Sequence, residues 1–140
     1  MLISTADCLR ILRIMFPGAD WRVKSSLGCA VERIQSTLNF KLYANVECVS
    51  DPAFAGVTAE DVLQLAPADY EHGFLLVVDQ ETVSSPEKLV LVVDLDEEPG
   101  RSFRAPPAEI QGIENNLSLA NLFFWECADA VDENGVFRLS

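Results

Sequence analysis

Hydrophobic and polar residues alternate at two different periods along this chain, and each period predicts a different element. Apolar side chains recur every three or four positions over residues 5–16, which predicts a helix that Pro17 and Gly18 end. Thr58, with Asp61 three residues later, has the arrangement of a helix N-cap. Similar signals predict four further helices: over residues 28–38, from Thr58 through Leu65, from Pro106 through Ile113, and over residues 122–131.

Other segments have the period of two that is typical of strands. Residues 40–48 alternate strictly between apolar and polar, and residues 21–24 do so over a shorter length. Because the helix predicted over residues 28–38 lies between them, the order strand, helix, strand predicts a parallel βαβ unit with a right-handed crossover.

Two nearly uninterrupted apolar runs, residues 74–78 and 89–93, predict central strands that are covered on both faces or on one face and by a helix. Only about ten residues join the runs, too few for a helical crossover, so we expect antiparallel neighbours. Asp79 and Asp94, which follow the apolar runs, would then lie at opposite ends of the sheet. Short strands are also predicted at Phe103 and over residues 136–137.

Together these elements predict an α/β fold, a single domain over residues 1–140 with a mixed β-sheet flanked by helices. In this interpretation, residues 1–17 form an extra N-terminal helical addition and residues 21–138 form the core. The chain, 49% hydrophobic, can bury roughly two-thirds of its unfolded surface. No apolar run reaches the ~20 residues of a membrane span, and charges interrupt any signal-peptide core, so we expect a soluble, cytoplasmic protein.

Charge is distributed unevenly along the chain. The formal net charge is −12 at pH 7, with +3 in residues 1–41 and −15 in residues 42–140. Such a surface repels nucleic acid and anionic membranes, whereas it attracts basic proteins or cationic ligands. The alternative is that the charge serves only solubility, although it exceeds the roughly 2–8 units that a small domain needs for that purpose.

Four cysteines, Cys8, Cys29, Cys48 and Cys127, lie far apart and include no C-x-x-C pair. This spacing argues against a zinc site or a redox motif. Their apolar neighbours favour buried, reduced thiols, and two disulfides in a secreted protein are the alternative.

Candidate catalytic groups are few. His72 is the only histidine, and no serine lies in a nucleophile elbow, so we interpret His72 as a strand-edge residue without a catalytic task. Asp94, Asp96 and Glu114 are oxygen donors of the kind that Mg²⁺ or Ca²⁺ prefers, which leaves a metal-dependent hydrolase as an alternative. The main interpretation assigns no enzymatic activity, no metal and no cofactor.

Two arginines, Arg101 and Arg104, stand in an otherwise acidic segment. We expect them to neutralise nearby carboxylates through bidentate contacts. The expected partners are Asp94, Asp96 or Glu114.

Residues 115–125, which lead into the last predicted helix and form its start, allow two further predictions. Asn115 and Asn116 are expected to form a capping or turn network between two helices. Phe123, Phe124 and Trp125 cannot all face inward from one helix, so one of them is expected to be exposed as an anchor for a partner. The alternative is that all three wrap the core on both sides of the helix.

Several stretches are similar to a small bacterial domain family of unknown function. The similarity covers residues 21–138 and is most specific from residue 44 onward. It is carried by ANVE at 44–47, DPAFAG at 51–56, VVD at 77–79, DLDEEPGRSF at 94–103, ENNLS at 114–118 and ADAVDENGVFR at 128–138. Family members tend to have Arg-Thr-Asp where this chain has Lys24-Ser25-Ser26, which argues against a catalytic carboxylate there. The resemblance implies a folded domain and no particular mechanism.

These observations favour a non-enzymatic domain that occludes a basic partner protein, as immunity and antitoxin proteins do with bacterial toxins. The alternatives are the hydrolase and a structural subunit that forms homo-oligomers through the N-terminal helix. The residues expected to contact the partner are Asp94, Asp96, Glu97, Glu98, Trp125, Glu126 and Asp129.

Overall fold

The computed structural model describes residues 2–4, 29–31, 46–50, 56, 58–66 and 69–139. Several predicted elements lie outside these residues: the helix over residues 5–16, the strand over 21–24, the rest of the helix over 28–38, and the first part of the strand over 40–48.

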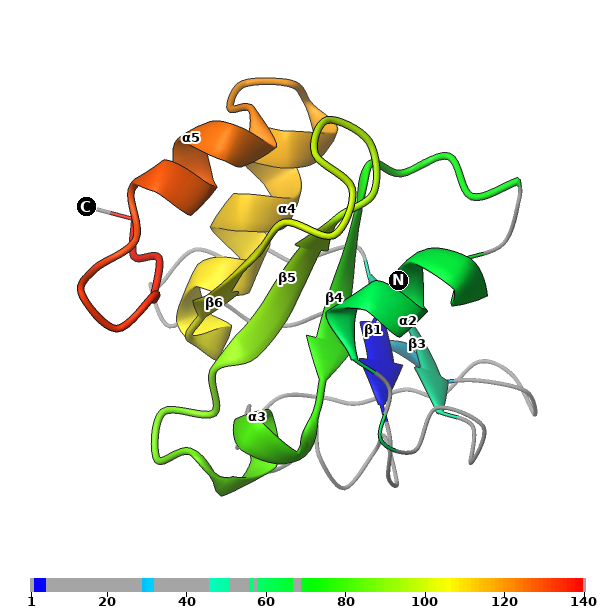
Figure 1. Ribbon diagram of the computed structural model, residues 1–140, viewed down its shortest axis with the longest axis horizontal. Coiled ribbons are helices and arrows are strands. Elements are labelled where there is room, and N and C mark those ends of the chain that lie inside the picture. Colours follow the sequence, from blue (N-terminus) through cyan, green and yellow to red (C-terminus); the bar gives the residue numbers. More distant parts are fainter. Residues whose placement is uncertain are drawn as a thin grey trace.

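A six-stranded sheet runs through the described residues, in the order β2-β3-β1-β4-β5-β6 (Figure 1). Its strands are β1 (Leu2–Ser4), β2 (Cys29–Val31), β3 (Val46–Ser50), β4 (Phe74–Val78), β5 (Val90–Asp94) and β6 (Ser102–Ala105). β1 runs parallel to β3 and β4, whereas the other neighbouring strands are antiparallel. The sheet is therefore mixed, and the predicted α/β class is confirmed.

The sequence pattern does not predict two of these strands. β1 lies between β3 and β4, although residues 1–17 are expected to be a helical addition, and the described part of that segment is a strand. β2 occupies the start of the helix predicted over residues 28–38, so that prediction is wrong at Cys29–Val31. Three apolar residues do not distinguish a helix from a strand by their period. The antiparallel ladder to β3, with Cys29 opposite Cys48, determines the conformation instead.

β4 and β5 are antiparallel neighbours, as predicted. Phe74 lies opposite Asp94 and Val77 lies opposite Leu91. The segment between the two strands contains only the short helix α3 (Gln80–Ser84). Because Asp79 follows the far end of β4, Asp79 and Asp94 lie at opposite ends of the sheet, as expected.

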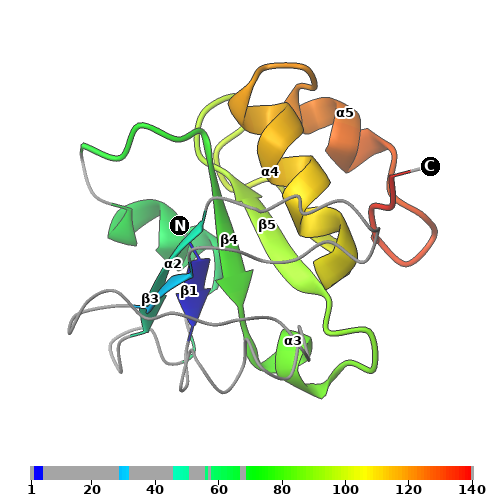
Figure 2. The ribbon, with the colours of Figure 1, turned by 180° about the vertical axis from the view of Figure 1, so that it is seen from behind.

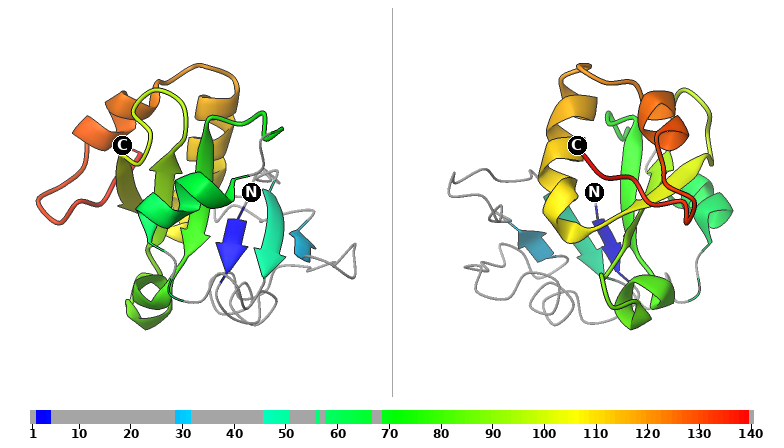
Figure 3. Two further views of the ribbon diagram at one scale, coloured as in Figure 1. Left: turned by 45° about the vertical axis from the view of Figure 1, so that its right-hand side comes forward. Right: turned by 90° about the vertical axis from the view of Figure 1, so that its left-hand side faces the viewer.

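Helices cover both faces of this sheet (Figures 2 and 3). α4 (Ile110–Ser118) and α5 (Phe124–Asp129) cover one face, and α2 (Ala59–Leu65) covers the other. All five residues of β4 are buried, and alternate residues point to opposite faces. Leu76 and Val78 therefore join a large cluster with residues of α4 and α5, whereas Leu75 and Val77 join a smaller cluster beneath α2.

Two short helices begin with reciprocal side-chain caps. Thr58 Oγ1 accepts a hydrogen bond from the Asp61 N–H (3.3 Å), and the Asp61 carboxylate accepts one from the Thr58 N–H (2.9 Å), which confirms the predicted start of α2. The hydrogen bonds from Thr58 lower the pKa of Asp61. At α3, Asp79 Oδ1 accepts from the Thr82 N–H (2.9 Å) and Thr82 Oγ1 accepts from the Asp79 N–H (3.3 Å).

The C-terminal elements follow the predictions with shifted bounds. A 3₁₀ turn, Pro107–Glu109, leads into α4, so the proline signal for a helix start is confirmed. α5 is shorter than the predicted helix over residues 122–131. The edge strand predicted over residues 136–137 is reduced to one parallel bridge between Val136 and Arg104.

Candidate functional site

The acidic loop, residues 95–100, joins β5 to β6 and is organised by Asp94. Asp94 is 1% exposed, and its Oδ1 accepts the N–H groups of Asp96 (2.9 Å) and Glu97 (3.2 Å). Its Oδ2 accepts the N–H of Glu98 (2.7 Å). Gly100, with φ +94°, closes the loop in a conformation that favours glycine. The buried carboxylate of Asp94 thus serves the backbone of the loop.

The turn between α4 and α5 is held by Asn116. Its carbonyl oxygen accepts the N–H groups of Asn121 (2.9 Å) and Leu122 (3.3 Å), and its Nδ2 donates to the Gly112 carbonyl (2.9 Å). Ala120, with φ +54°, lets the chain reverse within this turn. Asn115 and Asn116 lie in the last turns of α4 rather than between two helices, and the expected turn network is confirmed for Asn116.

Two aromatic side chains project from the start of α5, and we call them the aromatic pair. Phe123 is 53% exposed and Trp125 is 46% exposed, and their rings stack with centroids 6.3 Å apart and planes 12° apart. Phe124 between them is buried, so the three aromatic residues do not all wrap the core. Glu126 accepts a hydrogen bond from the Phe123 N–H (2.8 Å), which makes this carboxylate a cap of α5. Of the predicted contact residues on this helix, Trp125 and Asp129 are exposed, whereas Glu126 is partly buried.

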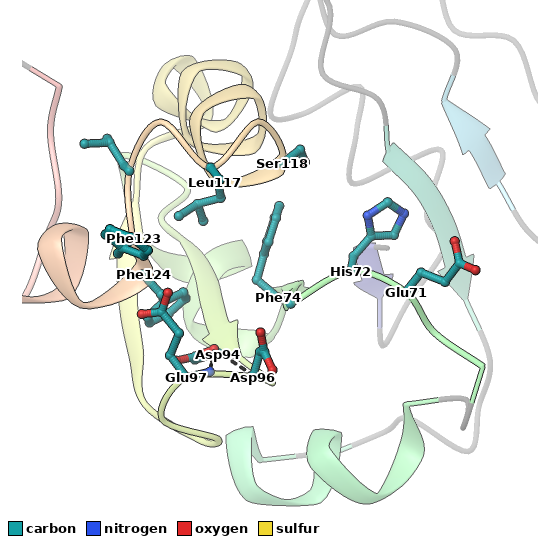
Figure 4. A pocket seen from close by; sticks show the side chains of 13 residues that line it. Glu71, His72, Phe74, Asp94, Asp96, Glu97, Leu117, Ser118, Phe123 and Phe124 are labelled. Carbon is teal, nitrogen blue, oxygen red and sulfur yellow. Dashed lines mark hydrogen bonds between the residues drawn. The ribbon is translucent and has the colours of Figure 1, made fainter.

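An open cavity of about 270 Å³, the α5 cavity, separates the acidic loop from the turn between α4 and α5 (Figure 4). Phe74, Phe123 and Phe124 line it from the sheet and from α5. Asp96 and Glu97 also line it, and Figure 4 shows their carboxylates rising from the loop on the same side as these rings. The cavity therefore combines apolar, aromatic walls with negative charge.

A second cavity of about 400 Å³, the α2 cavity, opens on the α2 side of the same end of the sheet. Its lining includes Leu63 and Tyr70. Both cavities are lined by Asp96 and by residues 71–73, which lead into β4. His72 thus lies between two hollows, although the sequence offered no catalytic partner for it.

Arg101 and Arg104 bind carboxylates other than those predicted. Arg101 pairs with Glu98 (2.5 Å) and with Asp129, and these hydrogen bonds raise the pKa of the guanidinium. Two predicted contact residues, Glu98 and Asp129, are therefore joined through Arg101. The prediction that Asp94, Asp96 or Glu114 would be the partners is wrong, because Asp94 is bound by backbone donors and the chain brings in carboxylates from other elements.

Arg104 holds the opposite end of the sheet. Its guanidinium forms a bidentate contact with Asp79 (2.7 and 3.1 Å) and a further pair with Glu81 (2.8 Å). Burial opposes the ionisation of Asp79, but the hydrogen bonds from Arg104 and from the Thr82 backbone outweigh it and lower the pKa of Asp79. This network fastens β6 to the start of α3.

The carboxylates of the hydrolase alternative do not form a metal site in the described part of the chain. No group of three or more His, Cys, Asp or Glu residues there is arranged to hold a metal ion. Asp94 is occupied by three backbone donors, and Glu114 on α4 accepts a hydrogen bond from Ser118 (3.1 Å). The N-terminal helix of the homo-oligomer alternative lies outside the described residues.

Cys127 is the cysteine whose side chain the structure describes. It is a free, buried thiol in the core beneath α5, as predicted. Burial, followed by the nearby charge of Glu126, raises the pKa of this thiol to about 11. The group is therefore a packing residue with little thiolate character.

Sequence reasoning missed several residues of the site. It did not single out Glu71 or His72 as cavity residues, and it expected one exposed aromatic residue where both Phe123 and Trp125 are exposed. The predicted antiparallel pairing of residues 74–78 with 89–93 could have indicated these residues, because it places residues 71–73 beside the loop that follows Asp94.

A mixed sheet with helices on both faces and an open, acidic, aromatic cavity at one end defines a small α/β domain. The chain belongs to the family described as Domain of unknown function (DUF6924), whose sequence profile matches residues 24–140. This match confirms the resemblance predicted over residues 21–138. Neither the curated proteins nor the solved structures gave a significant match to the chain. Among the helices that the structure describes, none is both long and apolar enough to cross a bilayer.

Proposed function

We propose that this domain is a non-enzymatic protein that binds a basic partner protein and neutralises it, as an immunity protein does with a bacterial toxin in the cytoplasm. The observation that carries the proposal is the aromatic pair, Phe123 and Trp125, exposed beside the carboxylates of the acidic loop.

An exposed aromatic surface favours association. Exposed apolar side chains that cluster mark binding surfaces more often than isolated ones do, and Trp is among the residues that dominate interface energies. Leu119, 64% exposed in the turn next to the aromatic pair, is a third large apolar side chain of the same segment. Burying these side chains against a partner would supply hydrophobic free energy in proportion to the area removed from water.

The surrounding charge favours a basic partner. The net charge of −15 in residues 42–140 attracts a cationic surface and speeds its association. Asp96 and Glu97 form no ion pair with the other described residues, so their charge is available to a partner. Glu98 and Asp129 already share Arg101 and would contribute less.

Co-expression tests the proposal. A toxin encoded next to this gene should kill a bacterial host, and the wild-type chain should restore growth. Replacing both aromatic residues, Phe123→Ser with Trp125→Ser, should abolish protection. Leu139→Ser is the matched control, because Leu139 is also an exposed apolar side chain (38%) but does not line the α5 cavity. A host that survives the toxin without this chain, or a double variant that protects fully, would contradict the proposal.

A further inference from the structure

The α5 cavity has the chemistry of a receptor for one cationic, planar group. Its aromatic lining comes from Phe74, Phe123 and Phe124. Asp96 and Glu97 provide exposed carboxylates beside these rings, and Glu71 lies farther away, beyond His72 (Figure 4). No lysine or arginine lines it among the described residues. Aromatic faces attract cations through the ring quadrupole, and carboxylates add direct charge pairing.

Two carboxylates at this cavity have no cationic partner among the described residues. The carboxylate of Asp94, which also lines the cavity, is occupied by three backbone N–H donors. Arg101, the nearest arginine along the chain, is held by Glu98 and Asp129. Asp96 and Glu97 are left without a cation from the described residues. A cation that enters the cavity therefore displaces no existing ion pair.

The size of the cavity limits what can enter. Pockets for small-molecule ligands occupy roughly 300–1,000 Å³, and this one, at about 270 Å³, lies below that range. Its volume suits one long side chain that reaches in from a partner surface. Phe123 lines the cavity and also belongs to the exposed aromatic pair. A partner that covers this pair can therefore place one of its side chains in the cavity.

We propose that the α5 cavity receives a single arginine side chain of the basic partner, with its guanidinium group paired to Asp96 and Glu97 and packed against the phenylalanine rings. This inference rests on the proposed function and specifies the partner residue. Arginine suits the site better than lysine, because the planar guanidinium stacks on aromatic faces and forms two parallel hydrogen bonds to a carboxylate.

The test uses three short peptides of the form acetyl-Gly-X-Gly-amide, where X is arginine, lysine or citrulline. Citrulline has the shape of arginine without its charge. Titrations followed by amide NMR shifts should show the arginine peptide perturbing Gly73, Asp96 and Glu97, with weaker binding of lysine and no saturable binding of citrulline. Equal binding of arginine and citrulline, or shifts confined to other parts of the protein, would overturn the inference.

Matched variants test whether the arginine peptide binds in the α5 cavity. Asp96→Asn with Glu97→Gln should weaken binding of the arginine peptide by about tenfold, because two partly exposed charge pairs are lost. Asp69→Asn with Glu133→Gln makes the same change in charge at exposed residues away from the α5 cavity and should leave binding unchanged. Ser118→Phe, which places a ring in the cavity and keeps every carboxylate, should abolish binding.

The two proposals fail in different ways. If the arginine peptide does not bind but the aromatic pair is still needed for protection from the toxin, the arginine receptor is wrong and the binding function stands. If the arginine peptide binds as expected but co-expression gives no protection, the receptor chemistry stands and the toxin-neutralising function is wrong.

Discussion

The α4/α5 face and the α2 face both bury alternate residues of the same strand, β4, but the clusters that they form differ in size. The α4/α5 face packs Phe74, Leu76 and Val78 against buried residues of two helices and of the C-terminal segment, including Phe124. The α2 face buries Leu75, Val77 and Val93 under partly buried neighbours such as Ala59 and Ala66. Two of the three rings that line the α5 cavity, Phe74 and Phe124, belong to the first of these clusters. That part of its wall therefore shares the stability of the main core, whereas the α2 cavity is bordered by the smaller cluster.

The largest expected effect tests that stability. Phe124→Ala should lower the free energy of unfolding by about 3–5 kcal/mol, because it removes a buried ring (4% exposed) and leaves a cavity. Urea unfolding measures the loss. Phe123→Ala, at the exposed neighbour, is the control and should change stability by less than about 0.5 kcal/mol. Similar losses in both variants would contradict the difference in burial.

A substitution beneath α2 should cost less. Val77→Ala removes two buried carbon atoms from the smaller cluster, and the free energy of unfolding should fall by about 2 kcal/mol. The same urea experiment measures it. A loss as large as that of Phe124→Ala would mean that the two faces stabilise the domain equally.

The ion pair at the far edge of the sheet should give an intermediate, pH-dependent effect. Arg104→Met should cost about 1–2 kcal/mol at pH 7, because it leaves the half-buried Asp79 without its bidentate partner. The lowered pKa of Asp79 means that its stabilising contribution is present above the ordinary carboxyl pKa and is lost as pH falls through the lowered value.

Measuring the stability of the wild type and of Arg104→Met at decreasing pH tests the expected direction of this pH dependence. The difference in stability between the two proteins should shrink as pH falls below about 4. A difference that stays constant down to pH 2 would show that Arg104 acts through packing rather than through its charge.

The smallest expected effect concerns the cap of α2. Thr58→Ala removes the acceptor for the Asp61 N–H and should cost up to about 1 kcal/mol. Amide hydrogen exchange should accelerate in Ala59–Leu65 and remain unchanged in Ile110–Ser118. Faster exchange in both helices would show that the two faces open together.

The sequence predicted the elements whose signals are local. β4 and β5 are apolar runs long enough to form buried strands, and Thr58 with Asp61 forms a cap within one helical turn. The aromatic stretch at α5 also indicated that some aromatic surface would be exposed. These predictions needed only neighbouring residues.

The ion pairs and the cavity, which the sequence did not predict, depend on contacts between residues that are distant along the chain. Arg101 meets Asp129 across 28 positions and Arg104 meets Asp79 across 25, so proximity along the sequence does not indicate these two partners. The role of Asp94 was missed for another reason. Its partners are the backbone N–H groups two to four positions later, as in a turn that begins with aspartate, whereas the sequence interpretation treated Asp94 as a surface carboxylate. The cavity itself arises where residues 71–73 and the acidic loop meet.

The position of β1 has a consequence for how the protein is made. Residues 2–4 leave the ribosome well before β4, yet they lie between β3 and β4 and pair with both. At ~5–20 residues per second, several seconds pass before the later neighbour exists. During that time the strand must stay unpaired on one side, so residues 2–4 are locked into the sheet only after β4 has been made.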